Sequence, residues 1–364
     1  MDKPALIASV FVALLLVGGA VTYVATEGPG PGLQSFGTRA AFNAYLDALR
    51  EADRPAARGL DWAQESTLGG LTGGGDTLDA GDFSGTNVQV AGVDEADIAK
   101  TDGELIYLAS GDEVVLLRAH PPDRMEVVSR IPGDALRSND EVELQVVGLF
   151  LHEEVLVVLS GLYAAYDFPQ IQPALEFRAL PFESRTLVSL FSVADPSDPV
   201  RLEVYELTGS YQAARLQGGV LYLVLQEPVY VQEEASFPAF CVDDRCQPYD
   251  GNQVFYDPEA PEAGSLTNIA AIDLATGVVG TLSLLTGYAS TIYMSRTSLF
   301  VTFAKWGRLG EALPPANLLV EETGYTSIYR IDVDGIDLSP ASWGNVKGWL
   351  LNQFSMDEHL GYLR

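Results

Sequence analysis

An acidic run, Asp332, Asp334 and Asp337, has the spacing that comes nearest to a metal site in this sequence. Carboxylates at alternate positions around a glycine supply the oxygen ligands that calcium prefers. A calcium loop of the EF type has its glycine later in the run and closes with a bidentate glutamate, and this run has neither feature. Since Asp-Gly between two strand-like segments is also a hairpin signal, we expect a turn here, with calcium as the alternative.

The two cysteines of the chain, Cys241 and Cys246, are separated by four residues. In an exported protein a disulfide is the default state of such a pair. The alternative is a metal site that includes Asp243 and Asp244, but two thiolates are too few for a closed zinc site. We therefore predict a disulfide that closes a small loop.

Histidine, a common catalytic base, occurs only as His120, His152 and His359. No two of them have the spacing of metal ligands. The sequence also has no H-E-x-x-H motif, no G-x-S-x-G nucleophile elbow and no glycine-rich nucleotide loop. We expect the histidines at turns or on the surface. Apart from the calcium alternative, the sequence predicts no catalytic, metal-binding or cofactor-binding residue.

The charge balance is strongly acidic, with 50 Asp and Glu against 21 Lys and Arg and a net charge of −29. A field of this sign repels nucleic acids and anionic lipid surfaces, so we exclude a nucleic-acid partner. The acidic residues are scattered along the chain. This pattern is typical of a halophilic protein, whose carboxylates are screened by high salt, or of an ordinary acidic secreted protein. We favour the halophilic interpretation.

The N-terminal residues 1–26 are predicted to form a membrane anchor. Pro4–Thr26 has no charged residue, and its length of about 23 residues suffices to cross the hydrocarbon core of a bilayer. A cleaved signal peptide is the alternative, with Gly18 and Ala20 as a weak cleavage site. We therefore expect a protein of the cell membrane with one N-terminal anchor and the remainder outside, or else a secreted protein.

The following residues, 27–85, are predicted to hold a short helix and a linker. The helix is expected from Ser35 to Ala52, with Pro55 as its stop signal. Its apolar side chains fall on one helical face, namely Phe42, Tyr45, Leu46 and Leu49. Residues 69–84 are rich in glycine, threonine and aspartate, which is the composition of a flexible linker.

Residues 86–364 are predicted to be almost entirely β-strands. A unit of two apolar strands joined by a tight turn recurs, for example in ADIAKTDGELIYLAS and TIYMSRTSLFVTFA, with further short strands between the copies. Short strands at regular spacing predict a sandwich, a barrel or a propeller. A four-stranded unit that repeats every roughly 45–80 residues favours the propeller, so we expect an all-β fold with about four blades.

Three sequence blocks occur in order within this region. The first is TNVQVAGVDEADIAKTDG at Thr86–Gly103, the second includes VADP at Val193–Pro196 and GSY at Gly209–Tyr211, and the third is LLNQFSMDE at Leu350–Glu358. Together they resemble the signature blocks of a family of secreted C-terminal β-propellers that is distantly related to WD40 repeats. The resemblance implies a propeller from residue 86 to 364 and an extracellular location, but no established reaction. Since further blades follow the third block in that family, we expect an incomplete ring here.

These observations lead to a functional hypothesis. We expect a membrane-anchored, outward-facing propeller that binds a protein or glycan of the cell envelope, because loops on a rigid scaffold commonly carry function. The alternatives are an extracellular hydrolase or lyase with carboxylates on the propeller axis, and a structural module stabilised by calcium. For Asp94, Glu95 and Asp97 of the first block we expect a role in the stacking of the blades.

Overall fold

The computed structural model describes residues 32–52, 88–136, 143–163, 184–229, 237–243, 245–258, 264–305 and 324–364. Within these ranges the chain is mostly β-strand, so the predicted all-β class is confirmed. In the same ranges no helix has the length and apolar character needed to cross a bilayer. The predicted anchor, residues 1–26, and the predicted linker, residues 69–84, lie outside the described residues.

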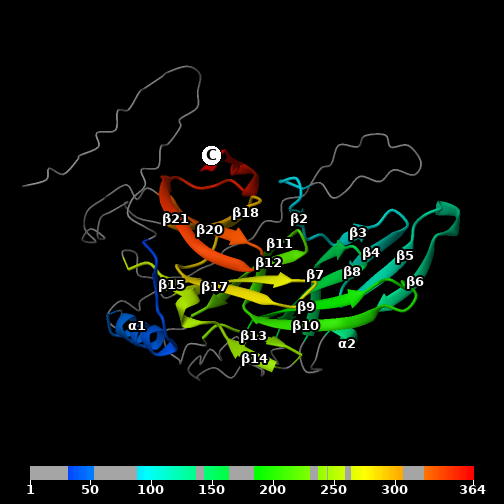
Figure 1. The fold of residues 1–364 in the computed structure, drawn as a ribbon, viewed down its shortest axis with the longest axis horizontal. Helices are drawn as coiled ribbons and strands as arrows, with labels where there is room; N and C mark the ends of the chain where they lie inside the picture. Colours follow the sequence, from blue (N-terminus) through cyan, green and yellow to red (C-terminus); the bar gives the residue numbers. More distant parts are fainter. Residues whose placement is uncertain are drawn as a thin grey trace, which may run out of the picture.

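Four large sheets, antiparallel except for the parallel pairing of β15 with β17, follow one another along the chain, and we number them in that order (Figure 1). The first sheet contains β3 (Ala99–Thr101), β4 (Leu105–Ser110), β5 (Glu113–Arg118) and β6 (Glu126–Ile131). A short 3-10 helix (Pro122–Arg124) precedes β6, and α2 (Gly133–Leu136) follows it. The fourth sheet contains β18 (Thr291–Met294), β19 (Ser298–Lys305), β20 (Tyr325–Asp334) and β21 (Asp337–Lys347).

The second and third sheets carry additional strands. The second sheet contains β7 (Glu143–His152), β8 (Val155–Tyr163), β9 (Arg185–Ser192) and β10 (Val200–Thr208), and the hairpin of β13 (Ala239–Val242) and β14 (Arg245–Pro248) extends it beyond β10. The third sheet contains β11 (Ser210–Gln217), β12 (Val220–Pro228), β16 (Ser265–Asp273) and β17 (Val279–Leu285), with β15 (Val254–Tyr256) beside β17 after the 3-10 helix Gly251–Gln253.

The chain continues beyond β21 with the 3-10 helix Gln353–Ser355 and a small hairpin of β22 (Glu358–His359) and β23 (Tyr362–Leu363). The Asn352 side chain caps the 3-10 helix by accepting a hydrogen bond from the Phe354 backbone. Met356 is buried against Tyr293 and Phe300 of the fourth sheet, so this final segment packs on that sheet.

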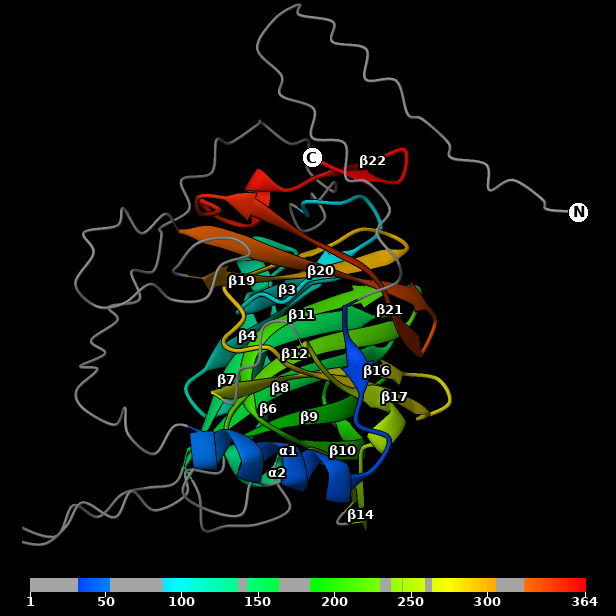
Figure 2. The same cartoon turned by 90° about the vertical axis from the view of Figure 1, so that its left-hand side faces the viewer.

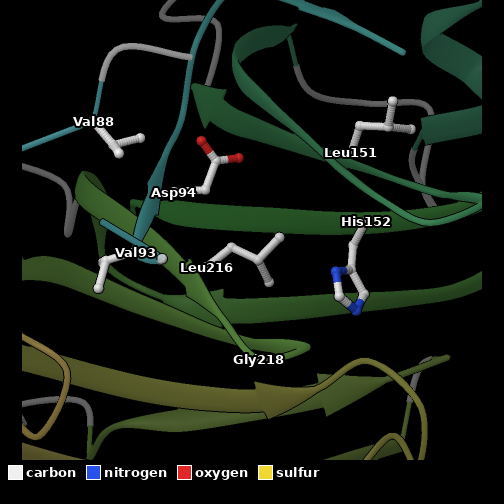
Figure 3. A pocket seen from close by; sticks show the side chains of 8 residues that line it. Val88, Val93, Asp94, Leu151, His152, Leu216 and Gly218 are labelled. Atoms are coloured by element: carbon white, nitrogen blue, oxygen red, sulfur yellow. The ribbon is translucent and has the colours of Figure 1, made fainter. Parts of the chain in front are cut away.

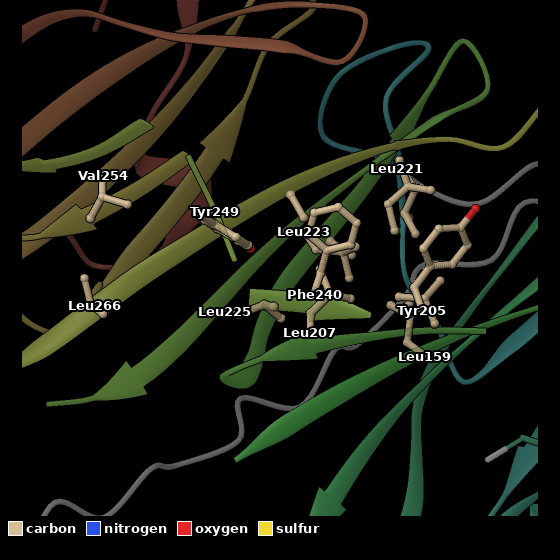
Figure 4. Packing of buried hydrophobic residues seen from close by; sticks show 14 of the residues in the cluster. Leu159, Tyr205, Leu207, Leu221, Leu223, Leu225, Phe240, Tyr249, Val254 and Leu266 are labelled. Carbon is tan, nitrogen blue, oxygen red and sulfur yellow. The ribbon is translucent and has the colours of Figure 1, made fainter. Parts of the chain in front are cut away.

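The core lies between consecutive sheets. Strand β12 has an unbroken apolar run because both of its faces are covered: Leu221 and Leu223 point toward the second sheet, and Tyr222 and Val224 toward the fourth. Figure 4 shows the packing between the second and third sheets around Tyr205 and Phe240. A third cluster of buried side chains joins the first and second sheets. Face-to-face contact between consecutive four-stranded sheets is the arrangement of propeller blades.

Two separate pieces of the chain, both before the first sheet in sequence, supply the two edge strands of the third sheet. Strand β1 (Gln34–Ser35) pairs with β15 at one edge, and β2 (Asp94–Glu95) pairs with β11 at the other. In Figure 2 the blue strand β1 leads toward α1 (Arg39–Ala52). Two distant pieces of the chain thus cover sheet edges that would otherwise expose unpaired backbone groups.

The helix predicted from Ser35 begins only at Arg39, so its first turn was predicted wrongly. Ser35 belongs to β1, and its hydroxyl donates to the Gly251 carbonyl at 3.2 Å. The Thr38 hydroxyl accepts from the Ala41 backbone at 3.1 Å, which is the N-cap that starts the helix. A side chain at Gly251 would clash with the backbone of Gly37, so glycine allows the helix entry to approach this closely.

Candidate binding site

One segment of the chain, Val88–Thr101, meets all four sheets, and we call it the signature segment. It supplies β3 of the first sheet and, through β2, pairs with β11 of the third. Asp97 and Leu149 of β7 exchange backbone hydrogen bonds of 2.8 and 3.3 Å. The first strands of the sheets, β3, β7, β11 and β18, are the leading strands. The signature segment supplies β3 and contacts β7, β11 and the turn that follows β18. Because one short segment reaches all of these places, the leading strands lie around a common axis.

Contacts to the fourth sheet and the C-terminal segment complete this path. The guanidinium of Arg296, in the turn after β18, donates to the Ala91 carbonyl from Nε at 3.1 Å and from Nη2 at 3.0 Å. The Gln89 side-chain amide donates to the carbonyls of Gln353 at 2.9 Å and Met356 at 3.1 Å. The first and third sequence blocks are therefore in direct contact.

Lys100 is a buried cation near the C-terminal end of the signature segment, in β3. Its ammonium donates to both carboxylate oxygens of Asp94 at 2.9 Å and to the Glu95 carbonyl at 2.7 Å. It also lies 5.4 Å from the centre of the Phe150 ring of β7, within cation–π range. The ion pair between Lys100 of β3 and Asp94 of β2 fixes the chain reversal between these two strands. Separating them would leave the buried ammonium without its counter-charge, which is energetically costly.

Arg215 of β11 forms the second buried ion pair. Its Nη2 lies 3.4 Å from Glu95 Oε1 and donates to Gln353 Oε1 at 3.0 Å. One guanidinium thus joins a carboxylate of the first block to an amide of the third. Asp94 and Glu95, the two acidic side chains of β2, are both paired with buried cations, and their expected role in the stacking of the blades stays a prediction.

A buried phenol lies beside Arg215. Burial raises the pKa of Tyr211 to about 12, and the charge of Glu95 acts in the same direction. Arg215 and a backbone hydrogen bond with Ala214 partly oppose this shift. The Tyr211 side chain therefore remains neutral at physiological pH and acts as part of the apolar packing around β11.

Beside these ion pairs lies an open pocket of about 240 Å³, drawn in Figure 3. It lies between the signature segment and the ends of β7 and β11. Its walls are mainly aliphatic and main-chain, with one carboxylate and one imidazole; the lining residues are Val88, Gly92, Val93, Asp94, Leu151, His152, Leu216 and Gly218. The pocket combines aliphatic side chains with two polar groups, and its size suits a single side chain or sugar unit.

The structure separates the three histidines. His152 ends β7 and lines the pocket, His359 lies exposed on β22, and His120 follows β5 before a cis peptide bond to Pro121. All three lie at strand ends or turns, as expected. Sequence reasoning missed the pocket, because its lining residues come from segments far apart in the chain.

The acidic run at Asp332 lies in the β20–β21 hairpin. Asp334 and Asp337 pair across the turn around Gly335, whose φ is 59°. Asp332 lies further up the strand, where its Oδ1 is 2.9 Å from Arg330 Nη2. Within the described ranges, no three His, Cys, Asp or Glu side chains converge as metal ligands. Asp334 and Asp337 therefore flank the predicted hairpin turn, while Asp332 lies on the strand that leads into it.

Cys241 and Cys246 are joined by a disulfide across the β13–β14 hairpin, where they face each other in register. The hairpin extends the second sheet, and Phe240 beside the disulfide packs into the core between the second and third sheets. The disulfide thus closes an added hairpin away from the signature segment.

Comparison with known proteins gives a family match and distant relatives. The model of a family described as a Beta propeller domain matches residues 83–364. An uncharacterized protein of Methanocaldococcus jannaschii is 25% identical over 354 residues, which cover 78% of this chain and 49% of that protein. An uncharacterized protein of Archaeoglobus fulgidus is 29% identical over 230 residues, which cover 61% of this chain and 32% of that protein. The chain thus spans about half, or less, of the length of these relatives.

Proposed function

Because the chain belongs to the Beta propeller domain family, we propose that it is a binding module that holds a partner at the pocket beside the signature segment. The proposed partner is a protein or glycan of the cell envelope. We place the propeller outside the cell, tethered to the membrane by residues 1–26.

The single observation that carries the proposal is the position of the pocket on a braced scaffold. Its lining comes from the signature segment and two leading strands; the Glu95–Arg215 ion pair joins the segment to β11, and the backbone hydrogen bonds between Asp97 and Leu149 join it to β7. A site whose walls are already in place loses little conformational entropy on binding. The open shape fits a group presented by a larger partner better than an enclosed small substrate.

Two further features support this reading. Asp94 and Glu95 form ion pairs with Lys100 and Arg215. These carboxylates therefore stabilise the fold, and they are not free for acid–base chemistry. The Cys241–Cys246 disulfide is typical of oxidising compartments, which supports an extracellular location.

The test uses isolated surface protein and surface polysaccharide from the producing organism as probes. Binding to the immobilised native chain is measured by biolayer interferometry, and the same mixtures are assayed for released peptides or reducing ends. We expect saturable binding to one probe without turnover, weakened about tenfold by His152→Ala or Val88→Arg, since loss of a central contact costs roughly 1–2 kcal/mol. His359→Ala is the matched control, because its imidazole is exposed outside the pocket.

Two results would contradict the proposal. Binding that is equally strong in the pocket variants would place the partner elsewhere on the propeller. Release of fragments that disappears with His152→Ala would favour the alternative of an extracellular hydrolase or lyase.

A further inference from the structure

The structure fixes where the chain leaves the propeller on its N-terminal side. Gly32 lies against the indole of Trp343, so that a methyl group at Gly32 would be only 3.0 Å from Nε1. Leu33 is buried between the third and fourth sheets, and Phe36 is buried between the second and third. The chain is therefore firmly docked from residue 32 onward.

This docking point lies at the outer edge of the sheets. Strand β1 is the last strand of the third sheet on the side opposite β2, and β21 is the last strand of the fourth sheet on the side opposite its leading strand β18. We call this edge the rim, defined as residues 32–35 and 338–347. Three strand spacings, about 14 Å, separate the rim from the leading strand of the fourth sheet.

The tether between the rim and the predicted anchor is short. Only residues 27–31 separate Thr26 from Gly32. Six peptide units extend over at most about 20 Å, whatever conformation they adopt. The rim must therefore lie within about 20 Å of the membrane end of the anchor, if residues 1–26 span the membrane as in the proposed function.

The charge distribution at the rim is unlike that of the chain as a whole. The chain has 50 acidic residues among 364, yet none occurs in the rim itself, residues 32–35 and 338–347. The rim contributes Lys347, which is exposed, and Arg39, at the start of α1 shortly after the rim, is also exposed. An anionic lipid surface repels carboxylates and attracts Arg and Lys side chains. The rim can therefore approach the membrane with little electrostatic repulsion.

The rim and the residues just after it present aromatic and aliphatic side chains. They contain two of the four tryptophans of the chain, Trp343 and Trp349. Val346 of the rim is 37% exposed, and Trp349, which follows the rim in the chain, is 47% exposed. Tryptophan is enriched at membrane–water interfaces, where its ring lies at headgroup level.

From these observations we infer that the propeller stands edge-on at the membrane, with the rim facing the lipid surface and the leading strands, beside which the pocket lies, on the far side from the lipid. This inference rests on the anchoring part of the proposed function. It adds an orientation: the propeller axis runs along the membrane plane, and both ends of the axis are open to partners beside the protein.

The experiment uses the full chain in liposomes of phosphatidylcholine and phosphatidylglycerol. A fluorophore is attached at Ser342→Cys on the rim or at Ser110→Cys in the first sheet, both exposed positions, while the native cysteines remain oxidised. A nitroxide on the lipid headgroups quenches over a short range. We expect several-fold stronger quenching at position 342 than at position 110. Insertion of about ten Gly and Ser residues after Glu27 is expected to remove most of this difference, because the tether then no longer holds the rim close.

Flotation of the liposomes separates the possible failures. If the chain floats with the lipid but quenching at position 110 equals or exceeds that at position 342, the edge-on orientation is wrong and the anchor stands. If the chain does not float with the liposomes, the anchoring in the proposed function is wrong, and the edge-on orientation is then wrong as well. Neither result changes the pocket-binding test, which needs no lipid.

Discussion

At the scale of single residues, the most consequential group is Lys100. Its side chain is 4% exposed and its partner Asp94 is 29% exposed. Removing one partner of a buried ion pair leaves an uncompensated charge, whereas exposed pairs contribute little. Within the first sequence block, Asp94 and the Glu95 carbonyl supply the oxygens that surround the Lys100 ammonium.

We predict that Lys100→Met lowers the free energy of unfolding by about 2–4 kcal/mol, because Asp94 loses its cation in a largely buried setting. Arg118→Ala is the matched control: Arg118 pairs with Glu104 and Glu126 at the surface, and we expect a loss of at most about 1 kcal/mol. Urea unfolding followed by tryptophan fluorescence measures both values. Equal losses in the two variants would show that the ammonium does not brace the leading strands.

At the scale of elements, α1 shows how the N-terminal segment joins the propeller. The family match begins at residue 83, yet α1 contributes to the core between the second and third sheets. Phe42 is fully buried, with ring contacts of 5.2 Å to Phe36 and 5.4 Å to Phe237. The helix is therefore part of the folded unit.

We predict that Phe42→Ala destabilises the whole domain by about 3–4 kcal/mol, since it removes a buried aromatic ring. Asn43→Ala, on the exposed face of the same helix, is expected to change stability by no more than about 0.5 kcal/mol. Thermal unfolding and limited proteolysis are measured together. A variant whose α1 is cleaved early while the sheets keep their melting temperature would contradict this, because α1 would then be a separate unit.

The sequence predicted the individual strands and turns better than it predicted which strands pair with each other. Apolar runs and turn signals suffice for strands such as β12 and for the turn at Gly335, because these depend on neighbours along the chain. Strands β1 and β2 have two residues each, too few to show a period. Their pairing depends on residues far along the chain, so Ser35 was assigned to a helix and the Glu95–Arg215 pair was not foreseen.

At the scale of the whole molecule, the net charge of −29 is spread unevenly. Leu274–Gly310, which covers β17 to β19, contains no acidic residue, so the carboxylates gather elsewhere on the molecule. Like charges at close spacing repel each other and favour the expanded, unfolded chain. The same asymmetry that leaves the rim free of carboxylates therefore concentrates the repulsion on the rest of the surface.

This repulsion predicts that stability rises with salt. Between about 0.1 M and about 1 M NaCl the Debye length falls from about 10 Å to about 3 Å, which screens the carboxylates from one another. We expect the melting temperature, measured by calorimetry, to rise by several degrees over this range. Sucrose at matched water activity is the control, because it is excluded from the protein surface without screening charge. A melting temperature that is flat or falls with NaCl, or rises equally in sucrose, would mean that charge repulsion does not limit this fold and would remove the basis for the halophilic interpretation.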